Sequence, residues 1–132
     1  MKEIGGFLSL ELNEGKHFHL NSVKLNLGRS CLKYIIRVKN ISKIYIPYYS
    51  CDSIVSSLED ENADYEYYHI DEKLNPIFSN ELKKNEYLLY INYFGLKDDE
   101  VKNISNSYKN IIIDNTQAFF SEHLEKTTTF YS

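Results

Sequence analysis

The residues from Ile111 to Ser121 combine a strand pattern with polar groups suited to ligand binding. Three isoleucines lead into Asp114, and Gln117 follows three residues later. A β-branched run favours a buried strand, so the pattern places a carboxylate at the strand's C-terminal end, where open α/β sheets bind ligands. Such a carboxylate can hold a protonated ring nitrogen. Helix capping, a turn and metal ligation are the alternative roles for Asp114.

A second group of candidate residues stands at the start of a predicted helix. Gly28 allows a ligand to approach the backbone closely, and the free N–H groups of a helix start attract anions. Arg29 adds a positive charge beside them. The pattern therefore indicates an anion site, and the simpler alternative is a plain helix start capped by Asn26 or Ser30.

Two more predicted strands end in polar residues. Asn92 closes an apolar run that Gly95 follows, and Cys51 comes soon after the run that ends at Pro47. The carboxyl ends of parallel strands meet at one edge of a sheet. We therefore expect these residues and Asp114 to surround one crevice.

The remaining chemistry-bearing residues give weaker patterns. His17 and His19 have a spacing that a metal site tolerates, but no acidic or cysteine partner stands nearby, so we predict no metal site. Cys51 has no adjacent histidine, which argues against a nucleophilic cysteine. The sequence contains neither a Gly-x-Gly-x-x-Gly loop nor a Walker-type loop.

The elements that position these residues alternate between strand and helix. Continuous β-branched and aromatic runs are typical of strands covered on both faces. We predict strands at 43–47, 65–70, 87–92 and 111–114, and a weaker one at 127–131. Apolar faces at helical spacing predict helices at 28–40, 52–58 and 98–108. The expected fold is α/β, with a mainly parallel sheet and helices on both faces.

The first 25 residues have a different pattern. Residues 7–12 and 17–20 alternate apolar and polar side chains around a turn at 13–16, which predicts a β-hairpin or extended arm. We expect one domain over residues 1–132, with a peripheral β arm over 1–25 and the α/β part over 26–132.

Composition excludes several classes of protein. The formal net charge is -4, whereas nucleic acids and anionic membrane surfaces attract clustered Lys and Arg. Two cysteines are too few for a disulfide scaffold. No signal peptide or membrane-spanning run stands out. We expect a cytoplasmic protein with reduced thiols and with neither nucleic-acid nor membrane partners.

Four sequence blocks resemble one known family. In order they are Leu25–Leu32, Ile46–Asp52, Asn92–Gly95 and Ile113–Ala118. The ordered set is similar to the DegT/DnrJ/EryC1/StrS family of sugar aminotransferases, which use pyridoxal 5'-phosphate and have the aspartate aminotransferase fold (fold type I). The form of the blocks resembles a branch found among surface-polysaccharide biosynthesis proteins. The likeness runs from about Leu25 onward and implies an incomplete fold type I large domain.

The resemblance implies a role for each matched residue. Gly28 and Arg29 match the residues whose backbone amides hold the cofactor phosphate. Asp114 matches the aspartate that pairs with the pyridine nitrogen, and Gln117 matches the residue beside the ring hydroxyl. Cys51 falls where the family usually places an aromatic side chain on the ring. The neighbouring tyrosines 48 and 49 are the nearest aromatic substitutes, and Asn92 falls where many members carry histidine.

The sequence departs from the family at its end. In the family, the lysine that binds the cofactor covalently follows a strand like that of residues 128–132, and no lysine stands at that position here. Lys126 is the nearest, and it precedes the strand. The resemblance therefore assigns no catalytic residue to this chain and implies little or no transaminase activity.

The complete relatives transfer an amino group, commonly from glutamate, to a keto group on a nucleotide-linked sugar. Their large domains pair as homodimers. Two other classes remain open at this point. One is a non-catalytic α/β binding or dimerisation module, and the other is a flavodoxin-like or receiver-like domain. A receiver would carry acidic residues at the end of its first strand, whereas the run at 43–47 ends in proline and tyrosines.

Overall fold

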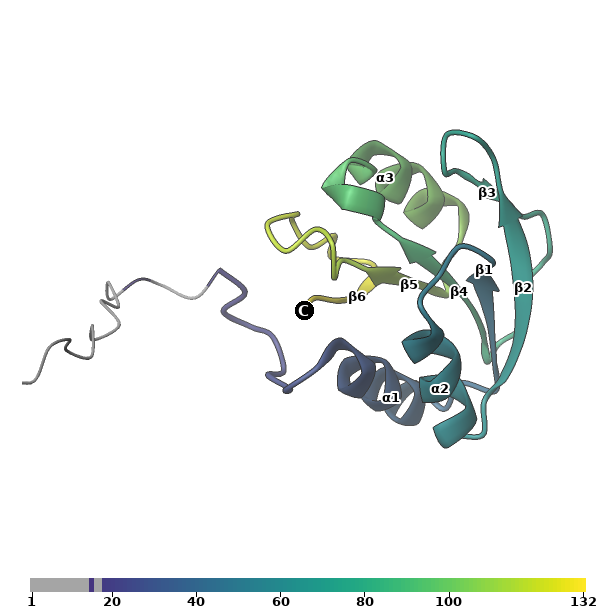
Figure 1. The fold of residues 1–132 in the computed structure, drawn as a ribbon, viewed down its shortest axis with the longest axis horizontal. Coiled ribbons are helices and arrows are strands. Elements are labelled where there is room, and N and C mark those ends of the chain that lie inside the picture. Colours follow the sequence, from purple (N-terminus) through teal and green to yellow (C-terminus); the bar gives the residue numbers. More distant parts are fainter. Residues whose placement is uncertain (1–14, 16–17) are drawn as a thin grey trace, which may run out of the picture.

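The computed structural model describes residue 15 and residues 18–132. Six strands form one curled sheet in the order β3-β2-β1-β4-β5-β6 (Figure 1), and every neighbouring pair is parallel except β2 with β3. The strands are β1 (Lys43–Pro47), β2 (Asp64–Ile70), β3 (Pro76–Ile77), β4 (Glu86–Ile91), β5 (Ile111–Asp114) and β6 (Thr128–Phe130). The predicted α/β class with a mainly parallel sheet is confirmed.

Helices cover both faces of the sheet. α1 (Gly28–Lys39) and α2 (Asp52–Asp60) pack together on one face, and α3 (Asp98–Ser107) lies on the other (Figure 1). A short 3-10 helix, η1 (Tyr93–Gly95), joins β4 to α3. Each α-helix buries the apolar positions that recur at helical spacing along it.

The direction in which strands are added to the sheet reverses between β1 and β4, which are neighbours. From β1 it moves outward to β2 and β3, and it then returns to add β4, β5 and β6 on the other side. In open α/β sheets, the crevice beyond the carboxyl ends of the strands at such a reversal is the usual ligand site. The strand order therefore predicts a ligand site between the segments that follow Pro47 and Ile91.

The strands β4 and β5 are the most buried strands of the sheet. All four residues of β5 are buried, and five of the six residues of β4 are buried. Such continuous burial requires cover on both faces of the strands, which the helices supply. The register sets Asp114 opposite Ile91 on one side and Phe130 on the other. The acid thus lies at the carboxyl edge between two apolar neighbours.

One short element was not expected from the sequence. The two-residue strand β3 was not predicted, because its pairing with His69 and Ile70 depends on the turn before it rather than on a local pattern. The weak strand expected at 127–131 is present as β6. The described residues contain no helix long and apolar enough to cross a lipid bilayer.

The predicted β arm lies mostly outside the described residues. Phe18–Leu20, the described end of its second strand, forms a bend and turn rather than a strand, so that part of the prediction is wrong. The His19 ring stacks on Tyr131 with centroids 3.8 Å apart and forms a hydrogen bond with the carbonyl of Phe119. These side-chain contacts hold the segment against the end of β6 without strand pairing.

Candidate functional site

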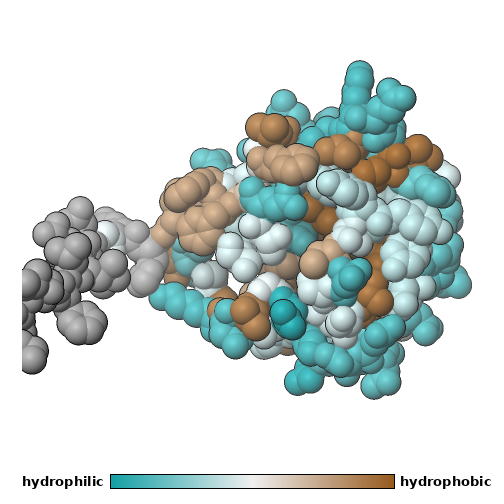
Figure 2. Space-filling view, in the orientation of Figure 1, coloured by the Kyte–Doolittle hydropathy of each residue, from teal (hydrophilic) through white to brown (hydrophobic). Residues whose placement is uncertain are grey.

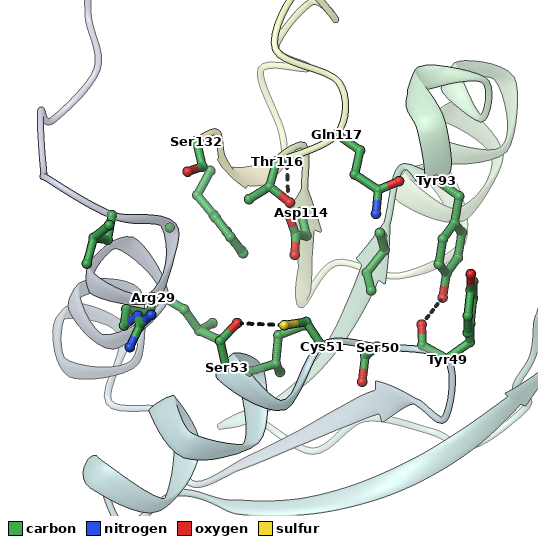
Figure 3. Close-up of a pocket in the computed structure, with 16 residues that line it drawn as sticks. Arg29, Tyr49, Ser50, Cys51, Ser53, Tyr93, Asp114, Thr116, Gln117 and Ser132 are labelled. Atoms are coloured by element: carbon green, nitrogen blue, oxygen red, sulfur yellow. Dashed lines mark hydrogen bonds between the residues drawn. The ribbon is translucent and has the colours of Figure 1, made fainter.

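A pocket of about 470 Å³ opens at the carboxyl edge of the sheet (Figure 3). We call it the edge pocket. Its volume lies in the range typical of small-molecule sites. It lies between the starts of α1 and α2 and the ends of β4, β5 and β6. Its lining is Leu27, Gly28, Arg29, Leu32, Tyr49, Ser50, Cys51, Ser53, Ile54, Ile91, Tyr93, Asp114, Thr116, Gln117, Phe130 and Ser132.

Asp114 is the most buried charged group of the edge pocket, with 5% of its surface exposed. Its Oδ1 accepts the backbone N–H of Thr116 at 2.9 Å, and the carboxylate is directed into the pocket (Figure 3). Burial raises the pKa of Asp114, and the hydrogen bonds from Thr116 only partly oppose that increase. No cation of the described residues pairs with this carboxylate. A positively charged or N–H-bearing ligand would supply the missing partner.

The start of α1 forms a second polar wall. Leu27 occupies the N-cap position, so no side chain caps the helix, and the first turn contains no acidic residue. Asn26 accepts the Ser30 hydroxyl at 3.0 Å instead of a backbone N–H, so the predicted alternative of a side-chain cap is wrong. The backbone N–H groups of Gly28 and Arg29 therefore have no partner among the described residues, which suits an anion.

Gln117 turns the nitrogen of its side-chain amide toward the pocket. Its Oε1 accepts the backbone N–H of Phe94 at 2.9 Å, which leaves the amide Nε2 turned toward the pocket interior (Figure 3). Phe94 has the left-handed conformation (φ 57°), and so does Gly95 (φ 66°). A Cβ on Gly95 would lie 3.3 Å from the Gln117 carbonyl oxygen. This close approach and the positive φ explain glycine at this position.

Cys51 lies on the wall opposite Asp114 (Figure 3). It is exposed and immediately precedes α2. The Ser53 hydroxyl lies 3.3 Å from Cys51 Sγ and is the main reason that the pKa of this thiol is lowered, and the charge of Arg29 acts in the same direction. The thiol is therefore accessible to a molecule inside the pocket.

Asn92 is the predicted site residue that does not line the edge pocket. Its side chain is fully buried. Nδ2 donates to Asp98 Oδ1 at 2.8 Å and to Ser121 Oγ at 3.3 Å, and Oδ1 accepts the N–H of Lys97 at 3.0 Å. These contacts tie the end of β4 to the start of α3. In the structure, Asn92 supports the turn beneath the site.

The structure adds residues that the sequence did not single out. Thr116 and Ser132 approach Gly28, and Ser53 lies beside Cys51. Tyr93, 2% exposed, belongs to the sequence block Asn92–Gly95, but nothing in the sequence distinguishes it from its neighbours there. Ser132 carries no sequence signal of its own. Only the three-dimensional arrangement brings these side chains to the pocket.

The edge pocket thus has two chemically distinct regions. The uncapped start of α1 with Arg29 attracts an anionic group, and the buried Asp114 carboxylate attracts a cationic or donor nitrogen. The amide of Gln117 can donate a hydrogen bond near the second region. A small ligand with an anionic group and a protonated heterocyclic nitrogen would satisfy these groups together.

Solved structures with a similar fold are aminotransferases. The putative aminotransferase from Burkholderia pseudomallei matches with a TM-score of 0.55 and 13% identity over 78% of this chain and 36% of its own. The aminotransferase from Psychrobacter cryohalolentis matches with a TM-score of 0.50 and 14% identity over 69% of this chain and 26% of its own. At these identities the likeness establishes shared fold only.

These matches cover only part of each aminotransferase. The chain spans about a quarter to a third of the length of the two aminotransferases. No protein-family model matches the sequence, and no curated protein matches it significantly. The described residues therefore share an α/β fold with part of these two aminotransferases.

Proposed function

We propose that this chain is the N-terminal part of a pyridoxal-phosphate-dependent aminotransferase-like protein of fold type I. The observation that carries the proposal is the Asp114 carboxylate, which is buried, lacks a cationic partner among the described residues and faces a pocket of suitable volume. A protonated pyridine nitrogen is such a partner. The aminotransferase fold of the similar structures supports the same assignment.

The described residues fit this cofactor at both ends. Gly28 and Arg29 would bind the phosphate through the uncapped start of α1, and Arg29 adds charge. A Cβ on Gly28 would lie 3.2 Å from the Thr116 methyl group and 3.4 Å from Ser132 Cβ, so glycine keeps the cradle open. The cofactor, when bound, supplies an electron sink for chemistry at an amine carbon.

Each of the other residues at the site has a defined task in this proposal. Asp114 keeps the ring nitrogen protonated, because a nearby negative charge favours the charged form. Gln117 would donate to an oxygen on the ring through Nε2, and the Phe94 N–H fixes the orientation of that amide by donating to Oε1. Cys51 lines the same pocket, so its thiol would lie beside the bound cofactor. Asn92 supports the β4 turn.

The choice of reaction within this class rests on the four sequence blocks. They support a protein related to the DegT/DnrJ/EryC1/StrS family, with a nucleotide-linked keto sugar as acceptor and an amino donor such as glutamate. Among the residues that line the edge pocket, none is a lysine. A lysine is the usual covalent anchor and proton carrier for this cofactor. We therefore expect binding without appreciable amine transfer by this chain alone.

Binding of pyridoxal 5'-phosphate by equilibrium dialysis tests the proposal. Asp114→Asn should raise the dissociation constant by about tenfold or more, because a hydrogen bond between charged partners is lost. Asp52→Asn is the matched control, since Asp52 is an exposed acid beside the pocket that does not line it. Equal binding by the wild type and Asp114→Asn would refute the assigned pairing, and turnover like that of a complete aminotransferase would refute the expected inactivity.

A second candidate function is self-association. Phe120 lies edge to face with both Phe18 and Phe119, and the rings of Phe18 and Phe119 are tilted with centroids 6.4 Å apart. Phe18, Phe119 and Phe120 are 55%, 45% and 76% exposed. Figure 2 shows hydrophobic side chains gathered on the surface of the described part of the chain. Exposed apolar clusters often mark protein interfaces. Sedimentation velocity over a concentration series tests this candidate, and a monomer at every concentration would contradict it.

A further inference from the structure

Among the described residues that line the edge pocket, Cys51 carries the only thiol. The chain contains one other cysteine, Cys31, which does not line this pocket. Cys51 is exposed and lies across the pocket from Asp114 (Figure 3). No lysine is found in the described lining. The thiol is therefore the strongest nucleophile that a ligand in the pocket would meet.

The surroundings of Cys51 favour its reactive thiolate form. The sequence offers no adjacent histidine, but the structure places Cys51 at the N-cap of α2, a helix start that no side chain caps. The hydroxyl and the backbone N–H of Ser53 lower the pKa of the thiol, slight burial and the Asp52 carboxylate oppose them, and Arg29 acts with Ser53. Because the thiolate is the nucleophilic form, Cys51 is prepared to attack an electrophilic carbon.

The polar groups of the pocket determine which part of a ligand faces Cys51. The buried Asp114 carboxylate lacks a cationic partner among the described residues, and the uncapped start of α1 suits an anion. In pyridoxal 5'-phosphate the aldehyde stands para to the ring nitrogen and next to the carbon that bears the phosphate arm. A ligand held by its nitrogen at Asp114 and by its phosphate at Gly28 would therefore turn its aldehyde away from Asp114. Cys51 lies on that side of the pocket (Figure 3).

We propose that Cys51 is a reversible covalent attachment site for the aldehyde carbon of pyridoxal 5'-phosphate. This inference rests on the proposed function, because it takes that cofactor to be the ligand. Cys51 Sγ forms a bond to the aldehyde carbon, the carbon–oxygen double bond becomes a single bond, and the thiol proton ends on that oxygen. The product is a thiohemiacetal, and its formation needs no oxidant and no further reactant.

Two ligands that differ in a single group test this proposal. Pyridoxine 5'-phosphate has an alcohol in place of the aldehyde and cannot form the bond. Equilibrium dialysis with both ligands gives a ratio of dissociation constants for each protein, in which general damage to the pocket cancels. The preference for the aldehyde should fall by about tenfold or more in Cys51→Ala, because the bond forms within a bound complex. Cys31→Ala is the matched control and should keep the wild-type ratio, since Cys31 does not line the pocket.

Absorption spectroscopy identifies the bond. The wild type should lose the band of the conjugated aldehyde on binding, whereas Cys51→Ala should retain it. A lysine would form a conjugated imine instead, which borohydride fixes to the protein and peptide mapping locates. An unchanged ligand preference in Cys51→Ala, or an aldehyde consumed only by lysines, would overturn the covalent attachment alone. A wild type that is folded by circular dichroism and binds neither ligand would overturn the proposed function and the attachment with it.

Discussion

Gly28 at the start of α1 lies directly against Thr116 after β5. A Cβ built on Gly28 would come within 3.2 Å of the Thr116 methyl group, closer than side chains ordinarily pack. The two residues are 88 positions apart in the sequence, and together they bring the helix start and the Asp114 segment to the same pocket. This close approach makes Gly28 a sensitive reporter of pocket geometry.

Replacing Gly28 with alanine should weaken anion binding at the pocket. The added methyl group must displace Thr116 or Ser132, at a cost of about 1 kcal/mol or more for overpacking. We expect the dissociation constant of pyridoxal 5'-phosphate, measured by equilibrium dialysis, to rise by about fivefold or more. Thr116→Ser removes the opposing methyl group and should restore part of the affinity in the double variant. A Gly28→Ala protein with unchanged affinity would show that the contact is not restrictive.

The ligand-free chain should reveal the buried Asp114 through the pH dependence of its stability. Burial raises the pKa of Asp114 above its ordinary value of 3.8. The folded state then binds the proton more tightly than the unfolded state, so this contribution to stability is complete below pH 3.8 and is lost as the pH rises through the folded pKa. The free energy of unfolding of the wild type, relative to Asp114→Asn, should fall with pH across that interval.

Urea denaturation at a series of pH values measures this difference. The Asp114→Asn variant is the suitable reference because the Oδ1 of its new amide side chain can still accept the Thr116 N–H. The contributions of the other carboxyl groups cancel when the two proteins are compared at each pH. A difference that stays constant, or that grows with pH, would contradict the account of Asp114 as a buried acid without a cationic partner.

The two cysteines should differ in reactivity toward iodoacetamide. Cys51 is exposed and its pKa is lowered mainly by the Ser53 hydroxyl, whereas burial raises the pKa of Cys31. The thiolate is the reactive form, so Cys51 should be alkylated about tenfold faster near neutral pH. Peptide mapping by mass spectrometry measures both rates in one sample.

Two variations of the alkylation experiment check its interpretation. Ser53→Ala should slow the reaction of Cys51 and leave Cys31 unaffected. Pyridoxal 5'-phosphate should protect Cys51, which lines the edge pocket. In concentrated urea the two rates should converge, because the local environment is lost. Faster labelling of Cys31 in the folded chain would be inconsistent with this structure.

Asn92 should affect stability more than ligand binding. Asn92→Ala leaves the Lys97 N–H without its acceptor and removes one of the two hydrogen bonds to Asp98 Oδ1, the other coming from the Ser121 hydroxyl. This loss should cost about 2 kcal/mol of unfolding free energy. Asn106→Ala, an exposed change on α3, should stay within about 0.5 kcal/mol of the wild type. Urea denaturation measures both variants. A folded Asn92→Ala protein that has lost affinity for pyridoxal 5'-phosphate would instead support the ligand role that the family resemblance implies.

The sequence pattern predicted the main elements correctly because the spacing of their apolar residues fits burial in only one type of secondary structure. The run from Ile111 to Asp114 and that from Lys43 to Pro47 match β5 and β1 residue for residue. The start of α1 at Gly28 also agrees. β3 could not be found in this way, since two residues contain no period and its pairing is set by the turn from Asp71 to Asn75.

The candidate site was predictable as a set of strand ends but not as a set of side-chain directions. Asp114, Gly28 and Cys51 line the pocket as expected from their places at the carboxyl edge. Asn92 ends a neighbouring strand, yet its side chain turns toward α3, because the chain bends into η1 directly after it. Which side of an edge a residue faces after its strand ends depends on the following turn. That information is not contained in strand periodicity.

The strand order has a consequence for the way the chain is assembled during synthesis. β1 is made first and becomes an interior strand, β2 is added on one flank, and β4, β5 and β6 then join one after another on the other flank. Each of these later strands finds its neighbour already synthesised, so the sheet can grow as the polypeptide leaves the ribosome. The pocket acquires its carboxylate only near the end of this process, when Asp114 emerges beside β4.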